Sequence, residues 1–250
     1  MTRTRELNLH SMDGTLPVTL HLPEGDAPGP FPPVILYMDG PGIRPAVQEI
    51  AARLSSHSFA VFLPDLFHRA GHYAPVDPMV VFTDPELRTR HRETLMASAT
   101  PANAMADTQA LLAAIETVPE AAPGPLGVVG YCMGGRLALI AAATFPECIG
   151  AIASFHGGGL ATEKPGSPHL LADRIKARVY IAGAIEDANF TEEQKGLLVA
   201  AFEAARLDHR IETFPARHGW VPRDTAVHDP AEAEHHWREL VPFLENALRG

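Results

Sequence analysis

The stretch that decides the fold is Leu126-Gly-Val-Val-Gly-Tyr-Cys132-Met-Gly-Gly-Arg-Leu-Ala-Leu139. An apolar run typical of a strand leads into Cys132, and an alanine-rich run typical of a helix follows it. Gly130 and Gly134 lie two residues before and after the cysteine, which gives the pattern G-x-C-x-G. A sharp strand-to-helix turn strains its central residue and leaves almost no room for side chains at the flanking positions. The sequence therefore predicts such a turn at Cys132.

This turn would lift the Cys132 sulfur above the edge of the sheet, beside the free N–H groups of the next helix. The partial positive charge there favours a thiolate and a developing oxyanion. We therefore interpret Cys132 as a nucleophile and expect the N–H of Met133 to stabilise the oxyanion. The alternative is a buried structural cysteine in a phosphate-binding connection, although the G-x-G-x-x-G spacing of such connections is absent.

The composition favours one globular domain that spans residues 1–250. The chain has 46% hydrophobic and 20% charged residues, which is enough for a full core. Its net charge of -10 would repel nucleic acid and anionic membranes, and its apolar runs are far shorter than the roughly 18 residues that cross a bilayer. We expect a cytoplasmic protein that has a small-molecule partner and no cofactor, either monomer or dimer.

Only two cysteines occur, Cys132 and Cys148. A disulfide between them would occupy the proposed nucleophile, and a reducing cytosol disfavours it. We therefore expect Cys148 to have a packing role.

The pattern along the chain predicts an α/β protein. Polar and apolar residues alternate over 4–10 and 16–22 around Asp13-Gly14, which indicates an antiparallel hairpin. Later strands, several of them continuous apolar runs typical of buried parallel strands, are expected at 34–38, 59–63, 126–131, 149–155, 178–182 and 209–214. Helical patterns are found at 46–56, 85–97, 102–117, 191–206 and 230–248 and directly after Cys132.

Two leading strands followed by alternating strands and helices, with a nucleophile near mid-chain, indicate the α/β-hydrolase architecture. We expect a mostly parallel central sheet of about eight strands with helices on both faces. The order of the strands is not readable from the sequence. Residues 66–84 are irregular, and a loop of this length usually covers a site.

In this architecture the acid and the base follow the nucleophile, each in the loop after a later strand. The loop after 178–182 carries Glu186 and Asp187. We take Asp187 as the acid because it lies nearer the next helix, with Glu186 as the alternative. Either carboxylate could instead only favour that helix N-terminus. The loop after 209–214 carries His218, the predicted base.

These residues suggest a reaction. His218 would take the thiol proton, Asp187 would fix the tautomer of His218, and Cys132 would attack an ester carbonyl to form a thioester. A second oxyanion donor is expected in the loop after 34–38, most plausibly the N–H of Gly40. Because a thiolate is itself a good leaving group, esters with activated leaving groups, such as enol lactones, should be preferred.

A metal site is not expected. His68 and His72 have the spacing of metal ligands on a helix, but the residues between them are typical of a loop and no third ligand is evident.

Four features together resemble the dienelactone hydrolase family, the cysteine branch of the α/β-hydrolases: Gly130-Tyr-Cys132-Met-Gly-Gly135, Pro64-Asp65-Leu-Phe, the loop of Asp187, and His218-Gly. The resemblance covers roughly residues 5–248. It implies hydrolysis of dienelactone, a cyclic enol ester, to maleylacetate in chloroaromatic breakdown.

The resemblance also implies that a carboxylate after the third strand keeps the resting thiol neutral until substrate displaces an arginine. The matching positions are Asp39 and Arg223. Both depart from the family pattern, since Asp39 is one methylene shorter than the family's glutamate and Arg223 lies one residue farther from His218.

Other residues suggest contacts with substrate. Arg88 and Arg90, in Arg88-Thr-Arg90-His-Arg92, could hold a substrate carboxylate in a bidentate fork, or could lie on a solvated helix face. His156 follows a strand end and is expected in the pocket. The activity expected is hydrolysis of a small ester or lactone. The alternatives are a general carboxylesterase or thioesterase and a non-catalytic binding protein.

Overall fold

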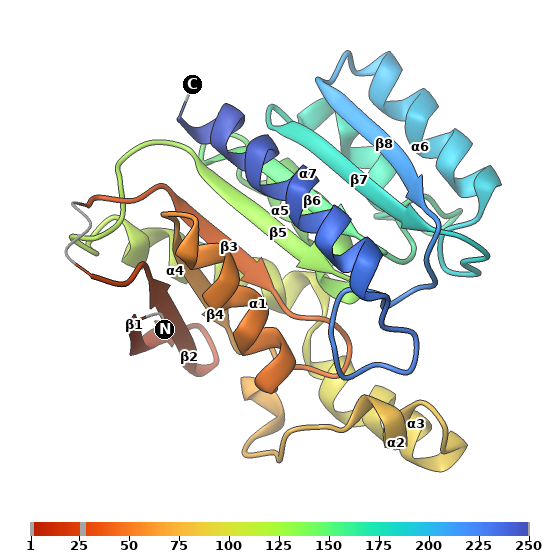
Figure 1. Ribbon diagram of the computed structural model, residues 1–250, viewed down its shortest axis with the longest axis horizontal. Helices are drawn as coiled ribbons and strands as arrows, with labels where there is room; N and C mark the ends of the chain where they lie inside the picture. Colours follow the sequence, from red (N-terminus) through yellow and green to blue (C-terminus); the bar gives the residue numbers. More distant parts are fainter. Residues whose placement is uncertain (1–2, 26–28, 250) are drawn as a thin grey trace.

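The structure is a computed structural model that describes residues 3–25 and 29–249. These residues form one eight-stranded sheet with the order β1-β2-β4-β3-β5-β6-β7-β8 (Figure 1). The strands are β1 Arg3–Ser11, β2 Gly14–Leu22, β3 Pro33–Tyr37, β4 Ala60–Pro64, β5 Leu126–Tyr131, β6 Ile149–Phe155, β7 Arg178–Ala184 and β8 His209–Phe214. β2 pairs antiparallel with β1 and β4, and the remaining pairs are parallel.

Burial explains the two kinds of strand pattern. Every residue of β3, β4 and β5 is buried, as the continuous apolar runs predict. β1 lies at the edge of the sheet and is mostly exposed, so its sequence alternates polar and apolar residues instead of forming a continuous apolar run. Ser11 pairs with Gly14, which confirms the predicted hairpin turn, and Gly14 has the positive φ of 130° that such turns require.

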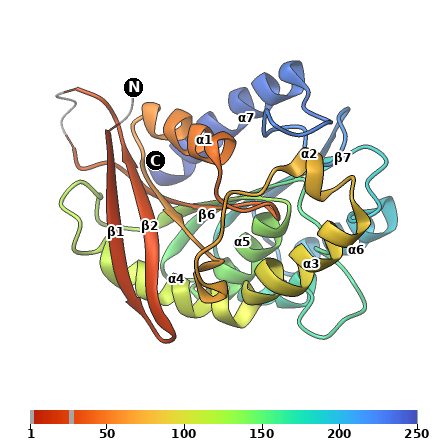
Figure 2. The ribbon, with the colours of Figure 1, turned by 90° about the horizontal axis from the view of Figure 1, so that it is seen from below.

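Helices cover both faces of the sheet (Figures 1 and 2). α1 and α7 pack on one face, and α4 and α5 pack on the other, with α6 beside them. Their bounds are α1 Pro45–Ser56, α4 Pro101–Ile115, α5 Met133–Thr144, α6 Glu192–Ala204 and α7 Pro230–Leu248. A 3₁₀ segment that the sequence did not predict, η3 Pro168–Arg174, contacts both α5 and α6. In the part of the chain that the structure describes, no helix is both long and apolar enough to cross a membrane.

Residues 66–84, expected to be irregular, contain the 3₁₀ turn η1 His68–Ala70 and the short helix α2 Pro78–Val81. The predicted helix at 85–97 is α3 Pro85–His91 followed by a π-helical turn, η2 Arg92–Met96. α2 and α3 begin in the same way: an aspartate caps the first N–H groups and a proline follows it. The repeated Asp-Pro pair was a readable signal for α2.

The parallel strands bring six loops to one edge of the sheet, because parallel strands end on the same side. These loops follow β3, β4, β5, β6, β7 and β8. In the sheet β5 lies between β3 and β6, so the loop with Cys132 has a neighbouring loop on each side.

Candidate active site

The turn at Cys132 is strained, as the G-x-C-x-G pattern predicts. Cys132 has φ 53° and ψ -113°, which places a residue other than glycine in the left-handed region. A Cβ on Gly130 would lie 2.1 Å from the carbonyl oxygen of Gly134, and a Cβ on Gly134 would lie 2.5 Å from that of Tyr37. Both glycines are therefore required by close backbone contacts.

His218 lies between Asp187 and Cys132. Its Nδ1 donates to Oδ2 of Asp187 at 2.7 Å, and Cys132 is its other hydrogen-bond partner. The second oxygen of Asp187 accepts from the backbone N–H (2.8 Å) and the side-chain amide (3.0 Å) of Asn189. Glu186, the alternative acid, has a side chain that is 77% exposed. The structure thus places Asp187, and not Glu186, next to His218.

The charges of this group favour a protonated His218. Burial opposes the charged form, but the hydrogen bonds with Asp187 and Cys132 and the negative charges of both partners raise the pKa of His218 to about 10. Burial likewise opposes ionisation of Asp187, but the contact with His218 keeps the pKa of this carboxyl below its ordinary value. An imidazolium therefore faces the sulfur at neutral pH, and a carboxylate holds it in place.

Cys132 and His218 open into a cavity of about 630 Å³, which we call the active-site cavity. Its lining includes all but two of the residues expected to contact substrate or to stabilise the oxyanion: Met133, Gly40, Asp39, His156 and Arg88. Pro78, Met79 and Phe82, in and next to α2, form part of its wall. The segment 66–84 therefore does contribute to the covering of this cavity.

The backbone around Gly40 is fixed by a contact that the sequence did not predict. Nε2 of His91, at the end of α3, donates to the carbonyl oxygen of Gly40 at 2.7 Å, and the contact is buried. Met96 lies on the other side of Gly40, with its Cε 3.5 Å from the position of a Cβ there. The π-helical turn and α3 thus support the loop of the expected oxyanion donor.

The expectation for Asp39 and Arg223 needs correction. Both carboxylate oxygens of Asp39 accept from Arg44, at 2.6 and 3.0 Å, and Arg44 also binds Asp224. The side chain of Arg44 is only 2% exposed. Arg223 instead points to the surface, where it pairs with Glu49, and is not among the residues that line the active-site cavity. The arginine next to Asp39 comes from five residues farther along its own loop.

The arginine-rich segment is also corrected in part. Arg88 lines the active-site cavity, whereas Arg90 lines a separate hollow on the outer face of α3. Arg92 lines the cavity with Arg88, because residues four apart lie on the same face of a helix. Arg136 does so from α5, one turn after Cys132. This i+4 spacing could have identified both Arg92 and Arg136 in the sequence.

His156 packs against the imidazole of His218. It is 1% exposed, and its ring centroid is 5.0 Å from that of His218. Its φ of 40° is again in the left-handed region, and neither ring nitrogen has a hydrogen-bond partner among the described residues. Burial and the neighbouring charge of His218 lower the pKa of His156 well below its ordinary value, so its ring is neutral.

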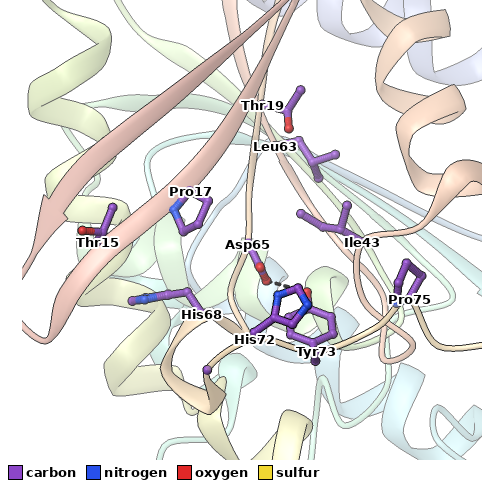
Figure 3. A pocket seen from close by; sticks show the side chains of 11 residues that line it. Thr15, Pro17, Thr19, Ile43, Leu63, Asp65, His68, His72, Tyr73 and Pro75 are labelled. Atoms are coloured by element: carbon purple, nitrogen blue, oxygen red, sulfur yellow. Dashed lines mark hydrogen bonds between the residues drawn. The ribbon is translucent and has the colours of Figure 1, made fainter.

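The other histidines singled out from the sequence lie elsewhere. His68 and His72 line a second cavity, of about 530 Å³, between β2 and the segment after β4 (Figure 3). His68 contacts Asp107 at 3.3 Å, and Tyr73 donates to Asp65 at 2.7 Å. Within the described ranges, no group of three or more His, Cys, Asp and Glu side chains could hold a metal ion.

Cys148 is not a packing residue. It is a free, exposed cysteine in the turn between α5 and β6, and the expectation that it is buried is wrong.

Comparison of the sequence and structure with known proteins identifies the family of this chain. Residues 17–248 match the dienelactone hydrolase family. A carboxymethylenebutenolidase of Rhodococcus opacus is 28% identical over 223 residues, which cover 86% of this chain and 81% of the relative. A Klebsiella pneumoniae protein crystallised as a candidate dienelactone hydrolase superposes with a TM-score of 0.84, at 20% identity and 98% coverage of each chain.

The family match covers most of the chain, and the superposition confirms the predicted α/β-hydrolase fold. The protein belongs to the dienelactone hydrolase family and is a carboxylic ester hydrolase.

Proposed function

We propose that the protein hydrolyses a small activated ester or lactone through Cys132, His218 and Asp187, with a thioester as the acyl-enzyme. The observation that carries this proposal is the continuous chain of contacts from Asp187 through His218 to a cysteine on a strained turn. A structural cysteine would need neither the strained backbone nor a buried imidazole–carboxylate pair beside it.

The steps follow from these positions. The Cys132 sulfur attacks the carbonyl carbon, and the carbonyl electron pair moves to the oxygen, which accepts from the N–H groups of Met133 and Gly40. When the intermediate collapses, the bond to the leaving oxygen breaks and His218 gives that oxygen its proton. Water then gives a proton to His218, attacks the thioester and releases the acid and the thiol.

The choice of sulfur limits the substrate. A tetrahedral intermediate expels its better leaving group, and a thiolate leaves more readily than an alkoxide. Acylation therefore proceeds only when the leaving oxygen is stabilised, as in an enol or phenol. The Rhodococcus opacus relative is named as a carboxymethylenebutenolidase, whose substrate is such an enol lactone. We extend this substrate class to the present chain.

Asp39 has a different role in this proposal. Arg44 binds both oxygens of Asp39 and neutralises its charge, so in this proposal Asp39 does not act on the Cys132 thiol. We assign Asp39 and Arg44 to fixing the loop of Gly40. Activation then needs no displacement of an arginine by substrate.

The test is turnover of an enol lactone and of phenyl acetate by the wild type, Cys132→Ala and Cys148→Ala. We expect Cys132→Ala to lose turnover of both esters and Cys148→Ala, the matched cysteine control, to retain it. Phenyl acetate turned over as fast as the lactone would favour a general carboxylesterase. Unchanged turnover in Cys132→Ala would reject the nucleophile and would favour a binding protein or a background hydrolysis of the esters.

A further inference from the structure

Arginines line the active-site cavity on both sides of Cys132. Arg136 follows Cys132 by one helical turn, and its guanidinium lies 4.0 Å from the position of a Cβ on Gly159, in the loop after β6. Arg88 and Arg92 belong to the segment of Met96, which lies against Gly40 in the loop after β3. Because β3 and β6 flank β5 on opposite sides, the two groups of arginines lie on opposite sides of the sulfur.

These arginines have no protein partner. Within residues 3–25 and 29–249, none of the three guanidinium groups makes an ion pair or a hydrogen bond, and Nε of Arg136 is buried without an acceptor. Arg44 and Arg69, by contrast, are each paired with two carboxylates. In a chain with net charge -10, three unpaired arginines around one cavity are a marked local excess of positive charge.

Nothing in the cavity lining balances this charge. Asp39 is the one carboxylate in the described lining, and Arg44 already neutralises it. The buried Nε–H of Arg136 has lost its hydrogen bond to water, and an acceptor on a ligand would replace that bond. Planar carboxylates are the groups that guanidinium forks bind best. The missing partners are therefore anionic groups of a ligand.

We propose that the substrate carries an anionic group on each side of the scissile ester. This proposal rests on the ester hydrolysis proposed above. His218 must reach the leaving oxygen, and His218 packs against His156, the first residue after β6. Arg136 lies beside the loop after β6 and so binds the anionic group of the leaving alcohol. Arg88 and Arg92 bind the anionic group of the acyl part.

Four esters with related skeletons test this. Phenyl acetate is neutral, monophenyl succinate carries a carboxylate on the acyl part, 4-acetoxybenzoate carries one on the leaving group, and mono(4-carboxyphenyl) succinate carries both. We expect the wild type to show the highest kcat/KM with the doubly anionic ester. The gain should decrease as the salt concentration rises, because salt screens charge pairs.

The variants separate the two sides. Arg136→Gln should raise KM about 10- to 100-fold for the two esters with a charged leaving group and should change KM for phenyl acetate much less. The Arg88→Gln/Arg92→Gln double variant should raise KM by a similar factor for the two succinates. Arg90→Gln, a control on the same helix but outside the cavity, should change none of them. Equal losses on charged and neutral esters, or losses on the same singly anionic ester in both variants, would overturn the proposal.

Binding without turnover gives a second readout. Cys132→Ala should bind mono(4-carboxyphenyl) succinate, measured by calorimetry, and should lose at least 10-fold in affinity when Arg136→Gln is added. If no ester is hydrolysed by the wild type but this binding is present, the proposed function fails and the anionic ligand stands. If phenyl acetate is hydrolysed through Cys132 but the binding is absent or insensitive to Arg136, the function stands and this inference fails.

Discussion

Asp39 and Asp187 follow strands on opposite sides of Cys132, and both are almost completely buried, at 4% and 7% exposure. Their partners differ. Asp187 accepts from the imidazole of His218, which can gain and lose a proton during a reaction, whereas Asp39 accepts from Arg44, which stays charged at any working pH. The same side chain is thus part of a proton-transfer chain at one strand end and part of a structural ion pair at the other.

A position after a strand end therefore does not by itself determine the role of a carboxylate in this fold. The role depends on the partner of the carboxylate. A carboxylate beside an imidazole sets the tautomer and orientation of a base. A carboxylate beside a guanidinium fixes a loop, and the pair is costly to break because the remaining charge is buried. Substitutions at the two aspartates should therefore affect different measured quantities.

Asp187→Asn should have the largest effect on catalysis. An amide can favour the wrong tautomer of His218 and cannot stabilise its charge, so kcat should fall about 10³- to 10⁴-fold. The alkaline limb of the pH–rate profile should also move to lower pH, because Asp187 helps to raise the pKa of His218 to about 10. Steady-state kinetics on an aryl ester measure both effects. Glu186→Gln is the matched control and should retain activity.

Asp39→Asn should instead lower stability. It leaves Arg44 buried with one fewer carboxylate, which typically costs about 3–5 kcal/mol of unfolding free energy. At a temperature where the variant is folded, kcat should remain within about tenfold of the wild type, since Asp39 touches neither His218 nor Cys132 in this account. Urea denaturation measures the stability.

The Asp39→Asn/Arg44→Met double variant sharpens this test. It should be less destabilised than the single variant, because the buried guanidinium is removed and the carboxylate of Asp224, which is 32% exposed, can be hydrated. A loss of kcat in Asp39→Asn as large as that in Asp187→Asn would make the two aspartates equivalent and contradict the comparison.

The histidines extend the comparison to pH. Within the described part of the chain, His156 and His236 are buried with no carboxylate partner, and burial lowers the pKa of His236 to about 3. Below pH 6.5 the unfolded chain therefore binds protons that the native state does not. The unfolding free energy should decrease as the pH is lowered from 6.5 to about 3. The slope should be about 1.4 kcal/mol per pH unit for each histidine.

His218 acts in the opposite direction. Its raised pKa stabilises the fold fully below pH 6.5, and this contribution is lost as the pH rises from 6.5 to about 10. Unfolding free energy from urea titrations should therefore be highest near neutral pH. His236→Gln, which can keep the hydrogen bond with Tyr131, should reduce the acid slope by about half. An unchanged slope would show that other groups cause it.

Arg223→Gln should have the smallest effect. Among the residues that the structure describes, Arg223 pairs only with Glu49 at the surface, and exposed ion pairs contribute about 0–1 kcal/mol. We expect kcat/KM to be unchanged for neutral and charged esters. A selective loss of kcat/KM on charged esters would instead show that Arg223, and not Arg44, acts at the active site.

Much of the fold could be predicted because its signals are local. Continuous apolar runs marked the buried strands, and the glycines around Cys132 marked the turn. The order of the strands could not be predicted, since it depends on contacts between distant segments. α2 was missed because its four residues make little more than one helical turn, which is too short for a repeating apolar pattern.

The candidate site divides in the same way. Cys132, Asp187 and His218 follow strand ends, so chain order alone suggested them. The contact of Arg44 with Asp39 depends on how one loop folds back on itself, and that of His91 with Gly40 joins residues 51 apart. No spacing rule in the sequence encodes either contact.

The central claim is that the Cys132 sulfur becomes acylated. The most direct test is intact-mass and peptide analysis of the protein quenched rapidly after mixing with 4-nitrophenyl acetate. The account predicts one acetyl group per chain, located on the peptide that contains Cys132, present in Cys148→Ala and absent in Cys132→Ala. An acetyl group on another residue, or wild-type turnover in Cys132→Ala without any adduct, would contradict it.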